Sequence, residues 1–182
     1  MLRLSGALLA VAMVCALILA LMYKQTAPVI EKQKQMLLER SLKSVLEADS
    51  YKKQEGDIEY FNAYDKDGGL VGWCLPMTSK GYGGKMQLLA GVDLNGRITG
   101  VNVLEQNETP GLGSKILEKE RDEPEAPFLA QFKQKKAEEL ILVKGQTTTN
   151  IQAITGATIS SKAVSEGVRK GVEAFFKNKD NQ

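Results

Sequence analysis

Hydrophobic residues dominate the start of the chain. The stretch from Leu4 to Tyr23 contains no charged side chain. At about 1.5 Å per residue, a helix of roughly 20 residues crosses a hydrocarbon core about 30 Å thick. A secretory signal peptide would have a shorter apolar region followed by a small-x-small cleavage site, and this stretch offers neither. The pattern therefore predicts a retained transmembrane anchor over residues 4–23, after a short tail of residues 1–3.

Apolar residues at helical spacing continue beyond this anchor. Pro28 is tolerated near the start of a helix, and an apolar stripe follows it as far as Ala48. The pattern predicts a juxtamembrane amphipathic helix over residues 24–48, which continues the membrane span or lies on the domain. A solvated stalk with an incidental apolar stripe is the alternative for the first half of this segment. The stripe consists of Ile30, Leu37, Leu38, Leu42, Val45 and Leu46.

Short β segments occupy the middle of the chain. Turn sequences at Asp65–Gly69 and Asp93–Gly96 each separate two such segments, and Asn-Gly in the second turn is a strong hairpin cue. Together they predict an antiparallel sheet of at least four strands, with Gly81–Gly84 as the loop between the hairpins. Trp73 and Cys74 fall in mid-strand, so we expect them in the core. The predicted strands are Ile58–Tyr64, Leu70–Leu75, Met86–Val92 and Arg97–Leu104.

The second half of the sequence is less regular and ends in a long helical pattern. The strands and helices do not alternate as βαβ units, which predicts an α+β domain over residues 49–178 and a polar tail over residues 179–182. The remaining predicted elements are a short helix that Ser114 caps and that runs to Glu120, a charged and solvated helix-loop-helix between Glu118 and Lys136, a strand over Leu140–Lys144, and a final helix from Ser161 onward.

Residue usage excludes several kinds of chemistry. The chain has no histidine, which rules out haem ligation by histidine, a Ser-His-Asp triad and the common zinc sites within this chain. Its two cysteines are Cys15, inside the anchor, and Cys74, so no disulfide framework is available. The net charge of +2 gives no argument for nucleic acid. A redox role would therefore require an organic cofactor.

A cluster of hydroxyl residues precedes the final helix. The stretch Thr155-Gly156-Ala157-Thr158-Ile159-Ser160-Ser161 combines small residues with hydroxyls on both sides and no charge. Unpaired N–H groups and the helix dipole favour a phosphate at such a helix N-terminus without any Lys or Arg. The same residues can equally act as an ordinary N-cap and a tight turn, and local physics leaves both interpretations open.

Three co-ordered motifs carry a resemblance to a known family. The run Ile154–Val164 resembles the flavinylation motif of the covalent FMN-binding domain, found in the G-type subunit of the Rnf electron-transport complex and in the C-type subunit of the sodium-pumping NADH:quinone reductase. Gly81–Lys85 and Glu108–Gly113 are similar to the two glycine-rich loops of this family, and Thr26–Ile30 is similar to the start of its subunits. The family usually has Asp six residues before the modified Thr, where this chain has Gln152.

The resemblance implies a membrane-anchored flavoprotein. Its FMN phosphate is expected to be esterified to the hydroxyl of Thr158 by a separate flavin transferase that uses FAD as donor. Electrons would enter and leave through neighbouring membrane and redox subunits, and the chain alone is expected to have no turnover and no catalytic residue. The expected FMN-binding residues are Thr158, Thr155, Gly156, Ala157, Ser160, Glu108, Thr109, Leu112, Tyr82 and Gly83.

The side of the membrane does not follow from charge. Arg3 precedes the anchor, whereas Lys24, Lys32 and Lys34 follow it with Glu31 among them, so positive-inside counting is ambiguous. The resemblance implies an anchor in the cytoplasmic membrane with the soluble domain on its outer side. Long domains translocate largely regardless of charge, so we follow the resemblance.

Other functions stay open at this point. The short chain favours the G-type subunit of the Rnf complex over the C-type subunit of the quinone reductase. A cofactor-free structural or assembly subunit is a second hypothesis, supported by Gln152. A phosphoesterase is a weaker third one, because the sequence has no histidine and no clustered carboxylates to bind a metal.

Overall fold

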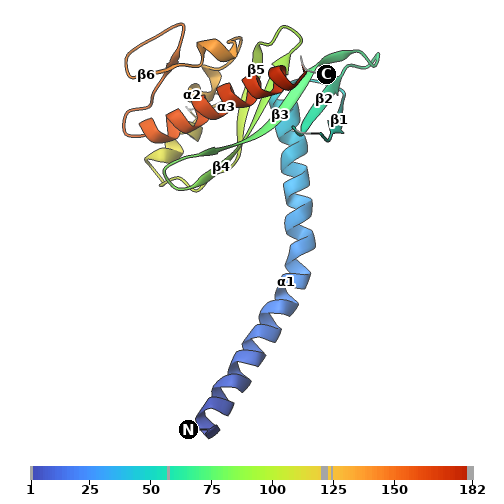
Figure 1. Cartoon of the computed structure of the whole chain (residues 1–182), viewed down its shortest axis with the longest axis vertical. Coiled ribbons are helices and arrows are strands. Elements are labelled where there is room, and N and C mark those ends of the chain that lie inside the picture. The colour runs from blue at the N-terminus through green and yellow to red at the C-terminus, as the bar shows by residue number, and fades with distance from the viewer. Residues whose placement is uncertain (1, 57, 120–122, 124, 180–182) are drawn as a thin grey trace. The chain divides into compact units, whose positions relative to one another are not determined.

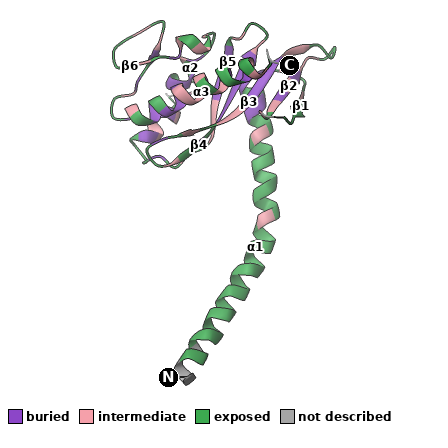
Figure 2. Ribbon diagram, viewed as in Figure 1, coloured by how far each residue is buried: buried purple, intermediate pink, exposed green. Residues whose placement is uncertain are grey.

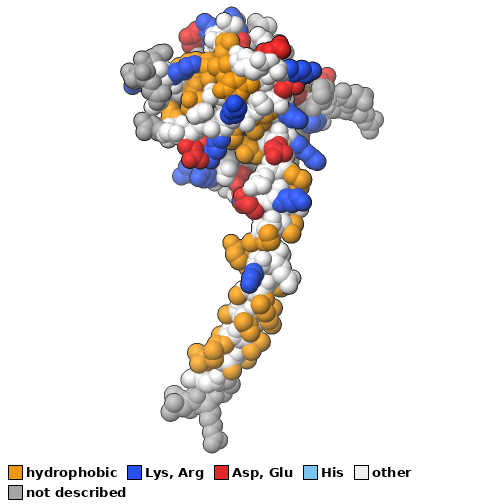
Figure 3. Space-filling view, turned by 90° about the vertical axis from the view of Figure 1, so that its right-hand side faces the viewer, with side chains coloured by type: hydrophobic (Ala, Val, Ile, Leu, Met, Phe, Trp, Pro, Cys, Tyr) orange, Lys and Arg blue, Asp and Glu red, His pale blue; other side chains and the backbone are white. Residues whose placement is uncertain are grey.

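The computed structural model describes residues 2–56, 58–119, 123 and 125–179. The chain divides into two compact units, Met1–Glu39 and Arg40–Gln182. The first unit is helix α1 (Leu2–Val45) up to the boundary between the units. From Leu8 onward this helix is long and apolar enough to cross a membrane, and hydrophobic side chains are exposed along it (Figure 3).

Helix α1 is continuous through the juxtamembrane segment. The sequence left open whether residues 24–48 continue the membrane span or lie on the domain. Here they continue the anchor helix without a break as far as Val45, and Pro28 lies inside this helix. Proline removes one backbone hydrogen bond from a helix interior. Many well-formed turns on both sides maintain the helix here, since helix propagation is favourable once several turns exist.

The second unit is built on a five-stranded antiparallel sheet whose strands follow one another in chain order (Figure 1). The expectation of at least four strands and the α+β class are confirmed. The two predicted turns are also present, since Asp65 Oδ1 accepts a bond from Gly69 N (2.7 Å) and Asp93 Oδ1 accepts one from Arg97 N (2.8 Å). The strands are β1 (Ser50–Gln54), β2 (Tyr60–Tyr64), β3 (Leu70–Lys80), β4 (Lys85–Asp93) and β5 (Ile98–Glu105).

Strand β1 was missed and β3 is longer than predicted. The sequence of β1 is polar and its residues are mostly exposed, so no alternation of apolar residues marks it. Strand β3 continues five residues past the predicted end at Leu75, because it pairs with β4 as far as Lys80 opposite Lys85. The existence of β1 and the length of β3 therefore both depend on pairing with a neighbouring strand, which the sequence of one strand alone does not reveal.

Short elements follow the sheet. They are two 3₁₀ helices, η1 (Gly113–Leu117) and η2 (Ala137–Glu139); helix α2 (Pro127–Ala130); the parallel strands β6 (Leu142–Val143) and β7 (Ile151–Gln152); and the long helix α3 (Thr158–Lys179). The predicted strand at Leu140–Lys144 is thus shorter than expected. The final helix begins three residues before Ser161, because the hydroxyl residues belong to its first turn.

Two expectations for this region are wrong. Ser114 does not cap η1, whose N-cap is Leu112; the Ser114 hydroxyl instead accepts a bond from Gly111 N (2.9 Å). The predicted end of that helix at Glu120 lies outside the described residues. The segment after it is not a solvated helix-loop-helix, because Phe128 and Phe132 are buried and pack edge to face.

The main core lies between one face of the sheet and α3, which packs against β3 and β4. Figure 2 shows buried residues concentrated in these elements. Trp73 contacts Phe175 of α3 at 5.4 Å between ring centroids, which confirms Trp73 as a core residue. The largest fully buried side chains in this core include Leu75, Met86, Leu88, Ile98, Phe132 and Val164.

The opposite face of the sheet receives the last turn of α1. Glycines on β3, β4 and β5 leave room for this turn, and a Cβ atom at Gly91 would overlap with the carbonyl of Val45. A Cβ at Gly100 would lie 2.9 Å from the Cα atom of Val45. The hydroxyl of Thr99 donates a hydrogen bond to the same carbonyl (2.5 Å). The end of α1 is therefore an integral part of the second unit.

Cys74 lies on β3 and is fully buried, which confirms its expected place in the core. Burial raises the pKa of its thiol from 9.0 to about 12. Because the thiolate is the reactive species, the native thiol should be inert at pH 8. In a Cys15→Ala background we expect no labelling of Cys74 by an aromatic disulfide reagent until denaturant is added. Rapid labelling of the native protein would contradict this burial.

The same pKa shift predicts a loss of stability at high pH. The thiol ionises near pH 9 in the unfolded chain but stays neutral when folded, so its contribution is complete below pH 9 and is lost as the pH rises toward about 12. A Cys74→Ala chain should show a weaker decline over that range in denaturant titrations. Equal declines in both proteins would contradict the assignment.

Candidate functional site

The N-terminus of α3 begins with a tight turn. Ala157 N donates to the carbonyl of Ile154 (3.0 Å), and Gly156 has a φ of +81°. That backbone conformation is unfavourable for residues with a Cβ atom, so the glycine sets the direction in which the chain enters the helix. Thr158 is the first residue of α3, where backbone N–H groups lack helical partners.

The hydroxyls of this first turn have different surroundings. Ser161 Oγ accepts a bond from the backbone N–H of Ile154 (3.2 Å), and the Ser160 hydroxyl donates to Glu108 Oε2. Within the part of the chain that the structure describes, the Thr158 hydroxyl has no hydrogen-bond partner. Ser161 thus holds the segment that leads into the helix, whereas Thr158 is available for another role.

A cleft of about 490 Å³ opens beside this turn. Its walls come from three segments: the loop between β3 and β4, the loop after β5, and the start of α3. Glu108 is the single acidic residue among those that line the cleft, and none of the lining residues is Lys or Arg. The lining residues are Tyr82, Glu108, Thr109, Leu112, Gly113, Gly156, Ala157, Thr158, Ile159 and Ser160.

Glu108 joins the three segments. It follows β5, and its carboxylate accepts a bond from Gly83 N in the β3–β4 loop (2.9 Å) as well as the bond from the Ser160 hydroxyl. Backbone bonds shape the loops themselves, including Gly81 N to the carbonyl of Gly84 (2.8 Å). The two glycine-rich loops and α3, distant in sequence, therefore meet at one carboxylate.

The structure brings together eight of the ten expected site residues in this cleft. Gly83 does not line it but binds Glu108 behind it. Thr155 lines a different cavity. Gly113 and Ile159 also line the cleft and were not among the expected site residues. Both belong to the motifs that carried the resemblance, so the motifs themselves were the signal that could have identified them.

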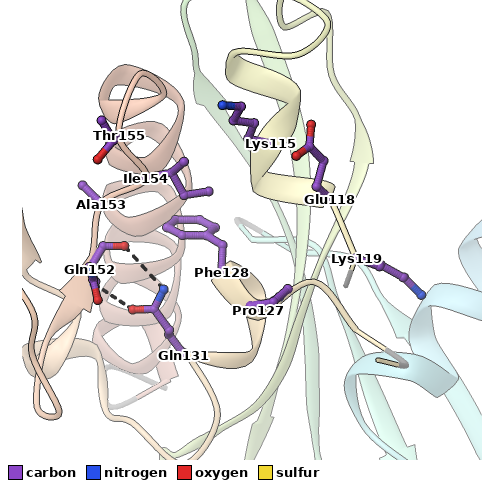
Figure 4. Close-up of a pocket in the computed structure, with 10 residues that line it drawn as sticks. All are labelled: Lys115, Glu118, Lys119, Pro127, Phe128, Gln131, Gln152, Ala153, Ile154 and Thr155. Carbon is purple, nitrogen blue, oxygen red and sulfur yellow. Dashed lines mark hydrogen bonds between the residues drawn. The ribbon is translucent and has the colours of Figure 1, made fainter. Parts of the chain in front are cut away.

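The second cavity, of about 400 Å³, lies between η1, α2 and the segment that leads to α3 (Figure 4). Its edge contains Gln152, the residue that departs from the family motif. The side-chain amide of Gln131 accepts a bond from Gln152 N (2.7 Å) and donates one to the Gln152 carbonyl (3.4 Å). This pair of bonds holds the backbone at position 152 while its side chain remains exposed.

Comparison with known proteins identifies the family. The FMN-binding domain family matches residues 81–173, and the RnfG N-terminal region matches residues 1–45. The G-type subunit of the proton-translocating ferredoxin:NAD(+) oxidoreductase complex of Clostridium ljungdahlii is 39% identical, over 88% of this chain and 83% of that protein. The chain belongs to the RnfG family of ion-translocating oxidoreductase subunits. Its second unit (Arg40–Gln182), called the soluble unit below, contains an FMN-binding domain.

Two further relatives place this family in a wider context. The G-type subunit of the Na(+)-translocating complex of Acetobacterium woodii is 41% identical over 60% of this chain, which spans about half of that protein's length (51%). The crystal structure of the C-type subunit of the Na(+)-translocating NADH-quinone reductase from Parabacteroides distasonis has a TM-score of 0.51 and 26% identity. That match covers 65% of this chain and 62% of the other. Both types of protein therefore share this fold.

The cleft fits a phosphorylated flavin on three grounds. Its volume lies within the range of about 300–1,000 Å³ typical of ligand sites. Thr158 offers an unpaired hydroxyl at the positive end of a helix dipole. Leu112, Tyr82 and Ile159 are exposed apolar or aromatic side chains at its walls, which suits a flat ring system.

Proposed function

We propose that this chain is a membrane-anchored electron carrier with FMN attached to Thr158, working within an ion-translocating ferredoxin:NAD(+) oxidoreductase. Family membership supports the complex, and helix α1 supports the anchor. The observation that carries the attachment is the unpaired Thr158 hydroxyl in the first turn of α3, at the edge of the cleft.

The attachment is a phosphoryl transfer that a separate flavin transferase performs with FAD. The Oγ1 atom of Thr158 forms a bond to the phosphorus on the FMN side of the FAD diphosphate. The bond from that phosphorus to the bridging oxygen breaks, AMP leaves with the oxygen, and the hydroxyl proton passes to solvent. Thr158 is therefore an attachment point. The ester also explains how a phosphate can be held in a cleft without any Lys or Arg among its lining residues.

Bound FMN supplies reversible electron transfer. The residues of this chain would position it: the first turn of α3 would hold the phosphate end, and the two glycine-rich loops would contact the rings. We assign direct contacts to Gly156, Ala157, Ser160, Glu108, Thr109, Leu112 and Tyr82, and a supporting role to Gly83, which binds Glu108. Thr155 lines the neighbouring cavity, so we assign it no contact with the flavin.

The redox partners are neighbouring proteins of the complex, and we place the soluble unit on the outer side of the cytoplasmic membrane. The resemblance of the chain to its family supports this side, and the long apolar stretch of α1 supports its role as the anchor. Protease treatment of intact spheroplasts should remove the soluble unit and leave the anchor. Protection of the soluble unit in intact spheroplasts would contradict the placement.

Intact mass and flavin fluorescence test this function directly. The full chain is purified in detergent from cells with and without a flavin transferase. With the transferase we expect a mass increase of one FMN less one water and a fluorescent band on a denaturing gel; without it we expect neither. An unmodified, colourless chain from transferase-containing cells would favour the cofactor-free structural role instead.

A further inference from the structure

Glu108 is the most deeply buried acidic side chain of the described second unit, with 6% of its surface exposed. Burying a charged carboxylate is costly unless hydrogen bonds compensate it. Two donors do so here: Gly83 N binds Oε1 at 2.9 Å, and the Ser160 hydroxyl binds Oε2. No Lys or Arg forms an ion pair with Glu108 in the described part of the chain.

The surrounding backbone is shaped to admit this carboxylate. A Cβ atom at Gly81 would overlap with Oε1 of Glu108, and a Cβ atom at Gly113 would overlap with Oε2. Two glycines from different loops thus leave the space that the carboxylate occupies. A site constructed in this way around an unpaired charge indicates a function for the charge itself, because an apolar side chain could fill the same volume at lower cost.

The charge lies where it can act on a ligand in the cleft. Glu108 lines the cleft, and its partner Ser160 is in the same helical turn as Thr158. Lys and Arg are absent from the lining residues. Charges interact more strongly in a partly dehydrated site than in water. Reduction of a flavin adds negative charge, so a nearby carboxylate disfavours the reduced form.

We propose that the buried carboxylate of Glu108, held in place by Gly83 and Ser160, lowers the reduction potential of the FMN attached at Thr158. This inference rests on the proposed function. Glu108 acts here as a potential-setting residue, because its charge changes the equilibrium between the oxidised and reduced flavin and takes no part in a bond-making step. The charge of a flavin's surroundings is one of the means by which a protein tunes the cofactor.

Redox titration of the purified, flavinylated full chain tests the proposal. Glu108→Gln removes the charge, keeps the side-chain shape and retains an acceptor for Gly83 N–H. We expect this variant to carry FMN by intact mass and to have a midpoint potential shifted to more positive values. Glu105→Gln is the matched control: Glu105 lies at the exposed end of β5, where solvent screens the charge, so its potential should equal that of the wild type.

A second variant keeps the test decisive if Glu108→Gln does not fold. Ser160→Ala leaves the carboxylate but removes the hydroxyl dipole that partly offsets its charge, so the potential should shift to more negative values. Unchanged midpoint potentials in the folded variants would overturn the proposed role of Glu108 but would not contradict the proposed function as a flavin carrier. A wild-type chain without FMN would instead contradict the proposed function, so the two failures are distinguishable.

Discussion

A Thr158→Ala chain is expected to fold normally and to carry no covalent flavin. Thr158 is half-buried at the first position of α3, and its hydroxyl has no partner in the described structure. Its removal therefore costs the fold little. The phosphoester, in contrast, has no other available hydroxyl among the first helical residues of α3, because the Ser160 and Ser161 hydroxyls are already engaged. Intact mass should fall by one FMN less one water in addition to the difference between Thr and Ala, and gel fluorescence should disappear.

Two control variants separate attachment from folding. Thr158→Ser keeps a hydroxyl at the same position, so it should retain covalent flavin. Thr148→Ala removes a hydroxyl from an exposed loop residue outside the cleft and should retain full flavin. Covalent FMN on Thr158→Ala in amounts similar to the wild type would place the attachment elsewhere. Peptide mapping would then identify the residue that carries it.

The sequence was sufficient to predict the two hairpins and the turn at Thr155–Ser161, because both depend on residues that are close together in the chain. Asp93 to Gly96 forms its turn through bonds within four residues, and the periodic apolar residues of α3 mark the helix that follows the motif. The same local features indicated a candidate phosphate site at the start of α3 but left an ordinary N-cap equally open. The resemblance then supplied the loops that surround it.

The features that the sequence did not predict depend on contacts between distant residues. The position of Gly83 behind Glu108 depends on a bond across 25 residues, and the cavity next to Thr155 depends on the bonds that join Gln131 to Gln152. Similarly, glycines inside β3, β4 and β5 would be expected to weaken the strands. Their role becomes clear only when the last turn of α1 is seen to pack against them. Periodicity alone contains none of these pairings.

Substituting Val for Gly91 is expected to destabilise the soluble unit by more than about 3 kcal/mol, which is large for a single substitution. A Cβ atom at this position would overlap with the Val45 carbonyl and lie 2.5 Å from Thr99 Oγ1. These are backbone and hydrogen-bonded atoms of the interface between the sheet and the end of α1. They cannot move aside without breaking the Thr99 bond that caps the helix, so the last turn of α1 must leave the sheet.

Trp73 provides the measurement for this variant. It is the one tryptophan of the chain and is buried in the core, so its fluorescence during urea titration follows the soluble unit and not α1. Chains from cells without transferase avoid quenching by flavin. Gly145→Val is the matched control, because a Cβ atom at Gly145 meets nothing within 4 Å, and its midpoint should stay near that of the wild type. Equal midpoints for Gly91→Val and Gly145→Val would mean that the end of α1 does not contribute to the stability of the sheet.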